Sequence, residues 1–98
     1  MKILEPVSFK NLELKNRLVW LPAVTCLADE EGYVTDELIE RHVARAKGGF
    51  ALIDVEACGV LDRKSPHLLR IHDDKYIPGL KKMVDAVHAE GCKMTVQL

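Results

Sequence analysis

Residues 35–57 read TDELIERHVARAKGGFALIDVEA, a helical pattern followed directly by a strand pattern. Thr35 can cap the helix, because a threonine hydroxyl accepts a hydrogen bond from a free N–H group of the first turn. The apolar residues that follow recur at helical spacing and define one face: Leu38, Ile39, Val43 and Ala46. The glycine pair at 48–49 ends this helix, and residues 51–57 are rich in β-forming side chains.

The neighbouring segments repeat the same two patterns. Residues 18–21 and 93–98 are short apolar runs typical of strands. A second helix starts near Asp74, with Pro78 in an early turn, and Gly91 ends it. The predicted order is strand, helix, strand, helix, strand, which favours parallel strands joined by right-handed crossovers.

The first fifteen residues follow a different pattern. A two-residue turn at Lys10-Asn11 would pair Phe9 with Leu12 and Val7 with Leu14. All four apolar side chains would then lie on one face. This pattern predicts a β-hairpin that caps a larger core.

Three parallel strands leave two open edges and one uncovered sheet face. We therefore expect residues 1–98 to be the N-terminal part of a single larger α/β domain, with a hairpin cap at 1–15 and the strands and helices at 16–98. The glycine fingerprint of a doubly wound nucleotide fold is absent after the first strand, where residues 22–26 read PAVTC. The long loop at 22–34 instead favours a TIM (β/α)8 barrel, in which such loops build the site.

Composition excludes several classes of protein. The chain has 14 basic and 15 acidic residues, so we expect no nucleic-acid partner. It has no apolar run of membrane-spanning length and no signal-peptide pattern, from which we expect a cytoplasmic protein without a membrane partner. Cys26, Cys58 and Cys92 form no Cys-x-x-Cys motif and are expected to be separate reduced thiols.

Histidines and basic pairs give no sign of a metal site or of chemistry. His42 and His88 fall within the two predicted helices, where a solvated histidine is the usual case, and the other two histidines lack ligand spacing. We therefore assign no metal. The pairs Arg63-Lys64 and Lys81-Lys82 are expected to be solvated surface.

Several stretches occur in an order and spacing that are typical of one family. They are residues 11–19 (NLELKNRLV) followed by Pro22, then 35–40 (TDELIE), 45–49 (RAKGG), 55–57 (VEA), 77–79 (IPG), 85–89 (DAVHA) and 96–98 (VQL). With these stretches the chain resembles the old yellow enzyme family of FMN-dependent oxidoreductases, and most of all its NADH:flavin oxidoreductase and 2,4-dienoyl-CoA reductase branch.

The resemblance implies a TIM barrel capped at its base by the hairpin, with FMN at the carboxyl ends of the strands. Family members pass hydride from NADH or NADPH through FMN to an activated alkene, the expected small-molecule partner. They are several times longer than this chain, which would be their opening portion and inactive alone. No catalytic residue is assigned here, and a 4Fe-4S cluster would belong to the missing C-terminal part.

The resemblance also implies five cofactor-binding residues: Pro22, Ala23, Val24, Ala57 and Gln97. The Gln97 amide would bond the pyrimidine edge of the flavin, because it offers both a donor and an acceptor. The small Ala57 would let the flavin approach closely, and the turn from Pro22 would run under the ring. Ala23 and Val24 depart from the usual larger apolar residue and threonine or cysteine, and Val24 has no side-chain donor.

Two carboxylates lie on the second predicted strand. Asp54 and Glu56 share a face with Leu52 by the period of two. Because carboxylates facing the helices would be costly, we expect this face to look into the barrel. A structural ion pair, with Lys93 as a candidate partner, is favoured over acid/base catalysis.

The third predicted strand follows the same alternation. We expect Thr95 and Gln97 to point to the barrel side, and Met94, Val96 and Leu98 toward the helices.

Two alternatives to a flavoenzyme remain open at this point. One is a non-catalytic fragment or self-associating module that uses its open sheet edges to bind a second copy, and the open edges also favour a homo-oligomer. The other is a TIM-barrel enzyme that works without flavin.

Overall fold

The computed structural model describes residues 1–63 and 65–98. Its strands are β1 (Val7–Phe9), β2 (Leu12–Leu14), β3 (Val19–Trp20), β4 (Leu52–Val55) and β5 (Lys93–Val96). Its α-helices are α1 (Asp36–Lys47) and α2 (Ile77–His88), and short 3-10 turns occupy Lys2–Leu4 and Asp74–Tyr76. The order of elements matches the predicted hairpin followed by strand, helix, strand, helix, strand.

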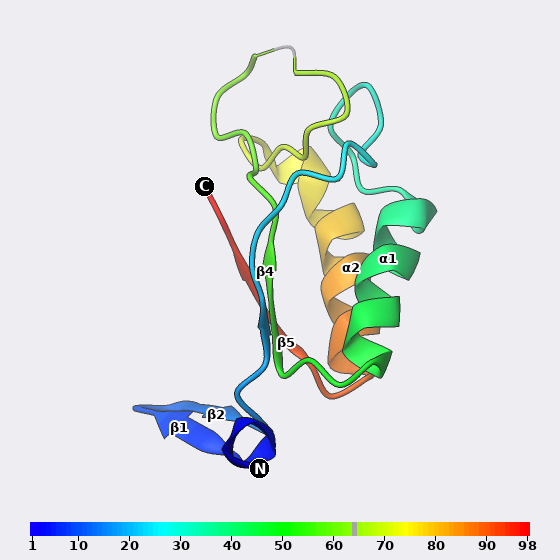
Figure 1. The fold of residues 1–98 in the computed structure, drawn as a ribbon. Coiled ribbons are helices and arrows are strands. Elements are labelled where there is room, and N and C mark those ends of the chain that lie inside the picture. The colour runs from blue at the N-terminus through cyan, green and yellow to red at the C-terminus, as the bar shows by residue number, and fades with distance from the viewer. Residues whose placement is uncertain (64) are drawn as a thin grey trace.

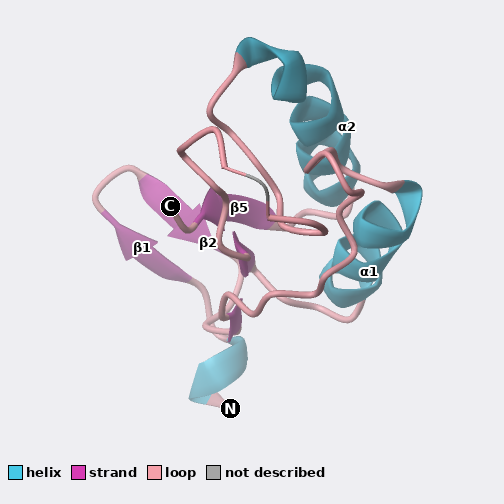
Figure 2. Cartoon of the chain, turned by 90° about the horizontal axis from the view of Figure 1, so that it is seen from above, coloured by secondary structure: helices cyan, strands magenta, loops and turns pink. Residues whose placement is uncertain are grey.

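Strands β3, β4 and β5 form a parallel sheet in that order, and β4 lies at its centre. Both helices lie side by side on one face of this sheet (Figures 1 and 2). The core between the two layers contains buried side chains from α1, β4 and α2: Leu38, Ala46, Ile53, Val55, Met83 and Val87. The predicted parallel topology is confirmed.

Helix α1 begins and ends where the sequence predicts. The Thr35 hydroxyl accepts a hydrogen bond from the Leu38 N–H at 3.2 Å, which satisfies one of the free donors of the first turn. After the helix, Gly49 has a φ of +111°, a conformation that a residue with a Cβ adopts at a cost. The cap and the glycine together set the length of the helix.

The hairpin has the predicted register, with Val7 opposite Leu14 and Phe9 opposite Leu12. Leu12 lines a cavity together with Leu52 and Cys92, so the hairpin lies at the amino end of the parallel sheet (Figure 1). The prediction of one shared apolar face holds only in part. Leu14 is 5% exposed, whereas Phe9, beside the turn, is 61% exposed because the core does not extend that far.

Two side chains of β5, those of Met94 and Val96, face the helices as predicted. Met94 packs against the core, and Val96 lines a groove together with Leu80 and Val84 of α2. Thr95 is exposed, as Val96 is, and lines the same groove, so the orientations of Thr95 and Gln97 stay predictions. The orientation of Leu98 stays a prediction.

The predicted surface charges and thiols are mostly as expected. Lys81 and Lys82 are exposed and form ion pairs with Asp85 and Asp36 respectively. Arg63 is exposed, and its neighbour Lys64 lies outside the described residues. The cysteines are free thiols, of which Cys26 is exposed and two are buried. Within the described residues, no helix has both the length and the apolar character to cross a membrane.

The prediction that His42 is solvated is wrong. His42 lies between Leu38 and Ala46 at four-residue spacing, so it belongs to the buried stripe of α1 and is 2% exposed. Neither ring nitrogen has a hydrogen-bond partner among the described residues. Burial, together with the charges of Arg45 and Arg41, lowers the pKa of His42 from 6.5 to about 4.

We predict that His42 makes the fold acid-sensitive. Its folded pKa of about 4 lies below its unfolded value of 6.5, so the unfolded chain binds the proton more readily between these values. The free energy of unfolding should therefore fall by up to about 3 kcal/mol as the pH drops through this window. Urea unfolding across this range, compared with His42→Leu, measures the effect. A wild-type pH dependence equal to that of the variant would contradict it.

The outer edges of β3 and β5 carry no partner strand among the described residues. Unpaired N–H and C=O groups on such edges are a template for pairing with another chain. We predict that the isolated 98-residue chain self-associates, and light scattering of the purified chain measures this. A stable monomer in dilute buffer would contradict the prediction.

Candidate functional site

The five candidate residues all follow the carboxyl ends of the parallel strands. Pro22, Ala23 and Val24 come directly after β3 and Leu21, whereas Ala57 follows β4 and Gln97 follows β5. Because parallel strands end at the same edge of a sheet, the three stretches lie together at the end opposite the hairpin (Figure 1). This is the edge at which TIM-barrel enzymes place their sites.

Backbone hydrogen bonds attach the end of β5 to the end of β4. The Gln97 N–H donates to the Val55 carbonyl at 3.2 Å, and the Gln97 carbonyl accepts from the Cys58 N–H at 2.9 Å. These two bonds enclose Ala57 and hold it beside Gln97. The Gln97 side chain is exposed, and its amide has no partner among the described residues, so it can bind another molecule.

A side-chain contact attaches the loop after β3 to the end of β4. The carboxylate of Glu56 accepts hydrogen bonds from the Thr25 N–H at 2.9 Å and from the Thr25 hydroxyl at 2.8 Å. Glu56 is 1% exposed. The contact places Val24, which precedes Thr25, near Ala57, which follows Glu56.

The prediction of an ion pair between this carboxylate and Lys93 is wrong. Lys93 is exposed, and no ion pair of Asp54 or Glu56 occurs among the described residues. The predicted face is confirmed, because Ile53 and Val55 enter the core on the helix side and leave Asp54 and Glu56 on the other. The sequence offered one signal for the true contact: a hydroxyl residue shortly after the neighbouring parallel strand.

Cys58 follows Ala57 and is buried. Burial and the nearby Glu56 carboxylate raise the pKa of the Cys58 thiol to about 11. The thiol is therefore protonated at neutral pH and is a poor nucleophile. It packs in the core with Leu69 and Met83.

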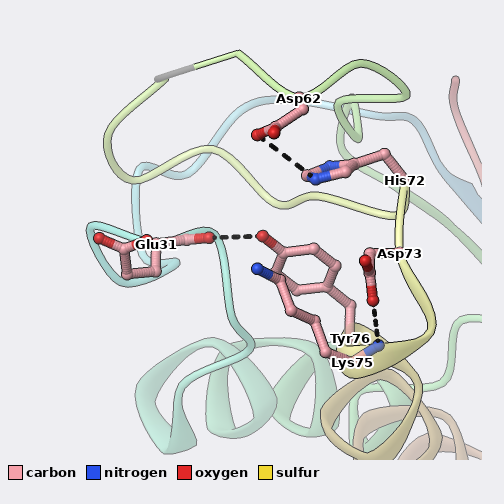
Figure 3. Close-up of polar contacts among 6 residues, drawn as sticks. All are labelled: Glu31, Asp62, His72, Asp73, Lys75 and Tyr76. Atoms are coloured by element: carbon pink, nitrogen blue, oxygen red, sulfur yellow. Dashed lines mark hydrogen bonds and ion pairs between the residues drawn. The ribbon is translucent and has the colours of Figure 1, made fainter.

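Two long loops close the edge beyond these residues. The Tyr76 hydroxyl donates to the Glu31 carbonyl at 3.0 Å, and His72 lies 3.6 Å from Asp62 (Figure 3). The Arg70 N–H also donates to the Gly32 carbonyl at 3.1 Å. The Tyr76–Glu31 and Arg70–Gly32 bonds join the loop after β3 to the segment between β4 and α2, whereas the His72–Asp62 contact lies within that segment.

Comparison with known proteins identifies the class. Residues 2–98 match the model of the NADH:flavin oxidoreductase / NADH oxidase family. The chain belongs to this family, which includes the old yellow enzymes that the sequence resembles.

Individual relatives agree with this assignment. The chain is 40% identical over 98 residues to a metal reductase of Desulforamulus reducens and 41% identical over 91 residues to an NADH oxidase of Thermoanaerobacter brockii. These alignments cover 98% and 90% of this chain but 14% of each relative. An NADPH dehydrogenase of Listeria monocytogenes is 35% identical, with 99% of this chain and 30% of that protein covered.

Solved structures confirm the fold. A 2-naphthoyl-CoA reductase complex matches 99% of this chain with a TM-score of 0.90 and 30% identity, over 15% of its own length. The old yellow enzyme of a Pichia species matches 99% with a TM-score of 0.89 and 26% identity, over 26% of its length. The chain has the fold of the N-terminal portion of an old yellow enzyme TIM barrel and spans less than a third of each of these relatives.

The contact between the loop after β3 and the segment after β4 gives a prediction about Gly32. Its φ is +87°, and a Cβ there would lie 2.5 Å from the Arg70 Cγ. We predict that Gly32→Ala loses more stability than the backbone cost of about 1–2 kcal/mol for a left-handed residue. Gly49→Ala is the matched control, because its φ is also positive and no atom lies within 4 Å of the added Cβ. Equal losses in thermal unfolding would contradict a close contact with Arg70.

Proposed function

We propose that this chain forms the first part of an FMN-dependent oxidoreductase that passes hydride from NADH or NADPH through FMN to an activated alkene of the enone or enoyl type. One observation carries the proposal. Three stretches far apart in the sequence are held together at the carboxyl edge of the sheet by the bonds of Gln97 and Glu56. The family match supports the same assignment.

The residues at this edge fit a flat, amide-containing ring. Ala23 and Val24 are exposed and offer apolar surface, and the small Ala57 leaves space beside the backbone. The free Gln97 amide can donate to one ring atom and accept from another. When bound, FMN supplies the hydride transfer, and these residues bind and orient it. Val24 offers no side-chain hydrogen bond, so any contact from this position comes from its backbone.

The remaining parts of the activity are assigned outside this chain. We propose that longer flanking sequence supplies the alkene-binding residues, the phosphate-binding loops and any 4Fe-4S cluster, and that the assembled enzyme is cytoplasmic. One relative is named an NADH oxidase and another an NADPH dehydrogenase, so we propose either NADH or NADPH as the hydride donor. Five further strands would complete a closed eight-stranded barrel.

The substitution Gln97→Ala in the full-length protein tests the proposal. Loss of the amide should raise the FMN dissociation constant about tenfold, because one hydrogen-bonding group leaves its partner unsatisfied. Flavin fluorescence during a titration measures this constant. Thr95→Ala is the control, since Thr95 is exposed and two residues earlier in β5, and it should bind FMN like the wild type.

Two results would count against the proposal. Equal affinities for Gln97→Ala and wild type would reject the role of Gln97. A full-length protein that binds no FMN would reject the flavoenzyme itself and favour a flavin-independent barrel enzyme or a self-associating module.

A further inference from the structure

Among the described residues no cation pairs with the buried Glu56 carboxylate, which is unusual for a charged side chain. Burying a carboxylate is costly unless hydrogen bonds compensate for the lost water. Among the described residues the compensation comes from Thr25, which donates both its N–H group and its hydroxyl to the two carboxylate oxygens. Such hydrogen bonds to a charged acceptor are stronger than neutral ones.

The same hydroxyl also organises the loop beyond it. The Thr25 Oγ1 accepts a hydrogen bond from the Leu27 N–H at 3.2 Å. Between them, Cys26 has a φ of +58°, a left-handed conformation that costs about 1–2 kcal/mol for a residue with a Cβ. The loop therefore holds an unfavourable turn, and the Thr25 contacts help to hold it.

The backbone pairing of β3 with β4 does not reach this point. It ends at Trp20 and Ile53. Beyond it, the Glu56–Thr25 contact joins the loop after β3 to the end of β4. Val24 and Ala57, on either side of the contact, are the candidate flavin residues.

We infer that Glu56 is a positioning residue for the candidate flavin-binding residues at the carboxyl edge of the sheet. Through Thr25 it fixes the backbone of Ala23 and Val24 at a set position relative to Ala57 and Gln97. This inference rests on the proposed function for its purpose, whereas the contact that it invokes can be tested without cofactor.

The first experiment tests the contact in the flavin-free full-length protein by amide hydrogen exchange. Thr25→Val keeps the shape of the side chain but removes the hydroxyl, and should speed exchange at the Thr25 and Leu27 amides at least tenfold. Thr25→Ser retains the hydroxyl and should restore protection. Amides of α1 serve as the internal control and should not change. Unchanged exchange at both loop amides in Thr25→Val would overturn the inference.

The second experiment tests the consequence for flavin binding. Thr25→Val and Glu56→Ala should each raise the FMN dissociation constant about tenfold and shift the visible bands of the bound flavin. The conservative variants Thr25→Ser and Glu56→Gln, which keep a hydroxyl and an amide carbonyl, should remain within about threefold of wild type. If Glu56→Ala does not fold, the comparison of Thr25→Val with Thr25→Ser decides whether the contact affects flavin binding.

The outcomes separate this inference from the proposed function. Wild-type affinity and spectra in Thr25→Val would overturn the positioning role while leaving FMN binding intact. A wild-type protein without FMN binding would overturn the proposed function, and the hydrogen-exchange result would still decide whether Glu56 holds the loop.

Discussion

The parallel pairing of β4 with both of its neighbours is the constraint on which the rest of the structure depends. It places the carboxyl ends of three strands at one edge and buries Ile53 and Val55 against the helices. Since side chains alternate, the same burial turns Asp54 and Glu56 to the other face. The position of Glu56, and with it the loop after β3, follows from the core packing of β4.

Local chemistry made most of the fold predictable from the sequence. The Thr35 cap, the glycines after the first helix and the turn of the hairpin act over a few residues, and the structure has each of them where expected. The alternation of strands and helices then predicted parallel topology. The carboxyl-edge location of the five candidate residues followed from that topology, whereas their cofactor-binding roles came from the family resemblance.

The contacts that the sequence did not reveal are those between distant segments. His42 belongs to the apolar stripe of α1 by its spacing, but a histidine in such a stripe is read as solvated until the packing around it is known. The charge of Glu56 predicts a basic partner, whereas the partner in the structure is a neutral threonine 31 positions away. Neither is specified by local pattern: the burial of His42 depends on how α1 packs on the sheet, and the Glu56 contact depends on how the loop after β3 lies against the end of β4.

A crystal structure of the full-length protein with bound FMN tests the central claim most directly. The account predicts the flavin ring at the carboxyl edge of β3, β4 and β5, with the Gln97 amide within hydrogen-bond distance of its pyrimidine edge and Ala57 in contact with the ring. It also predicts that the Thr25 bonds to Glu56 persist. A flavin bound elsewhere, with the Gln97 amide facing solvent, would contradict the account.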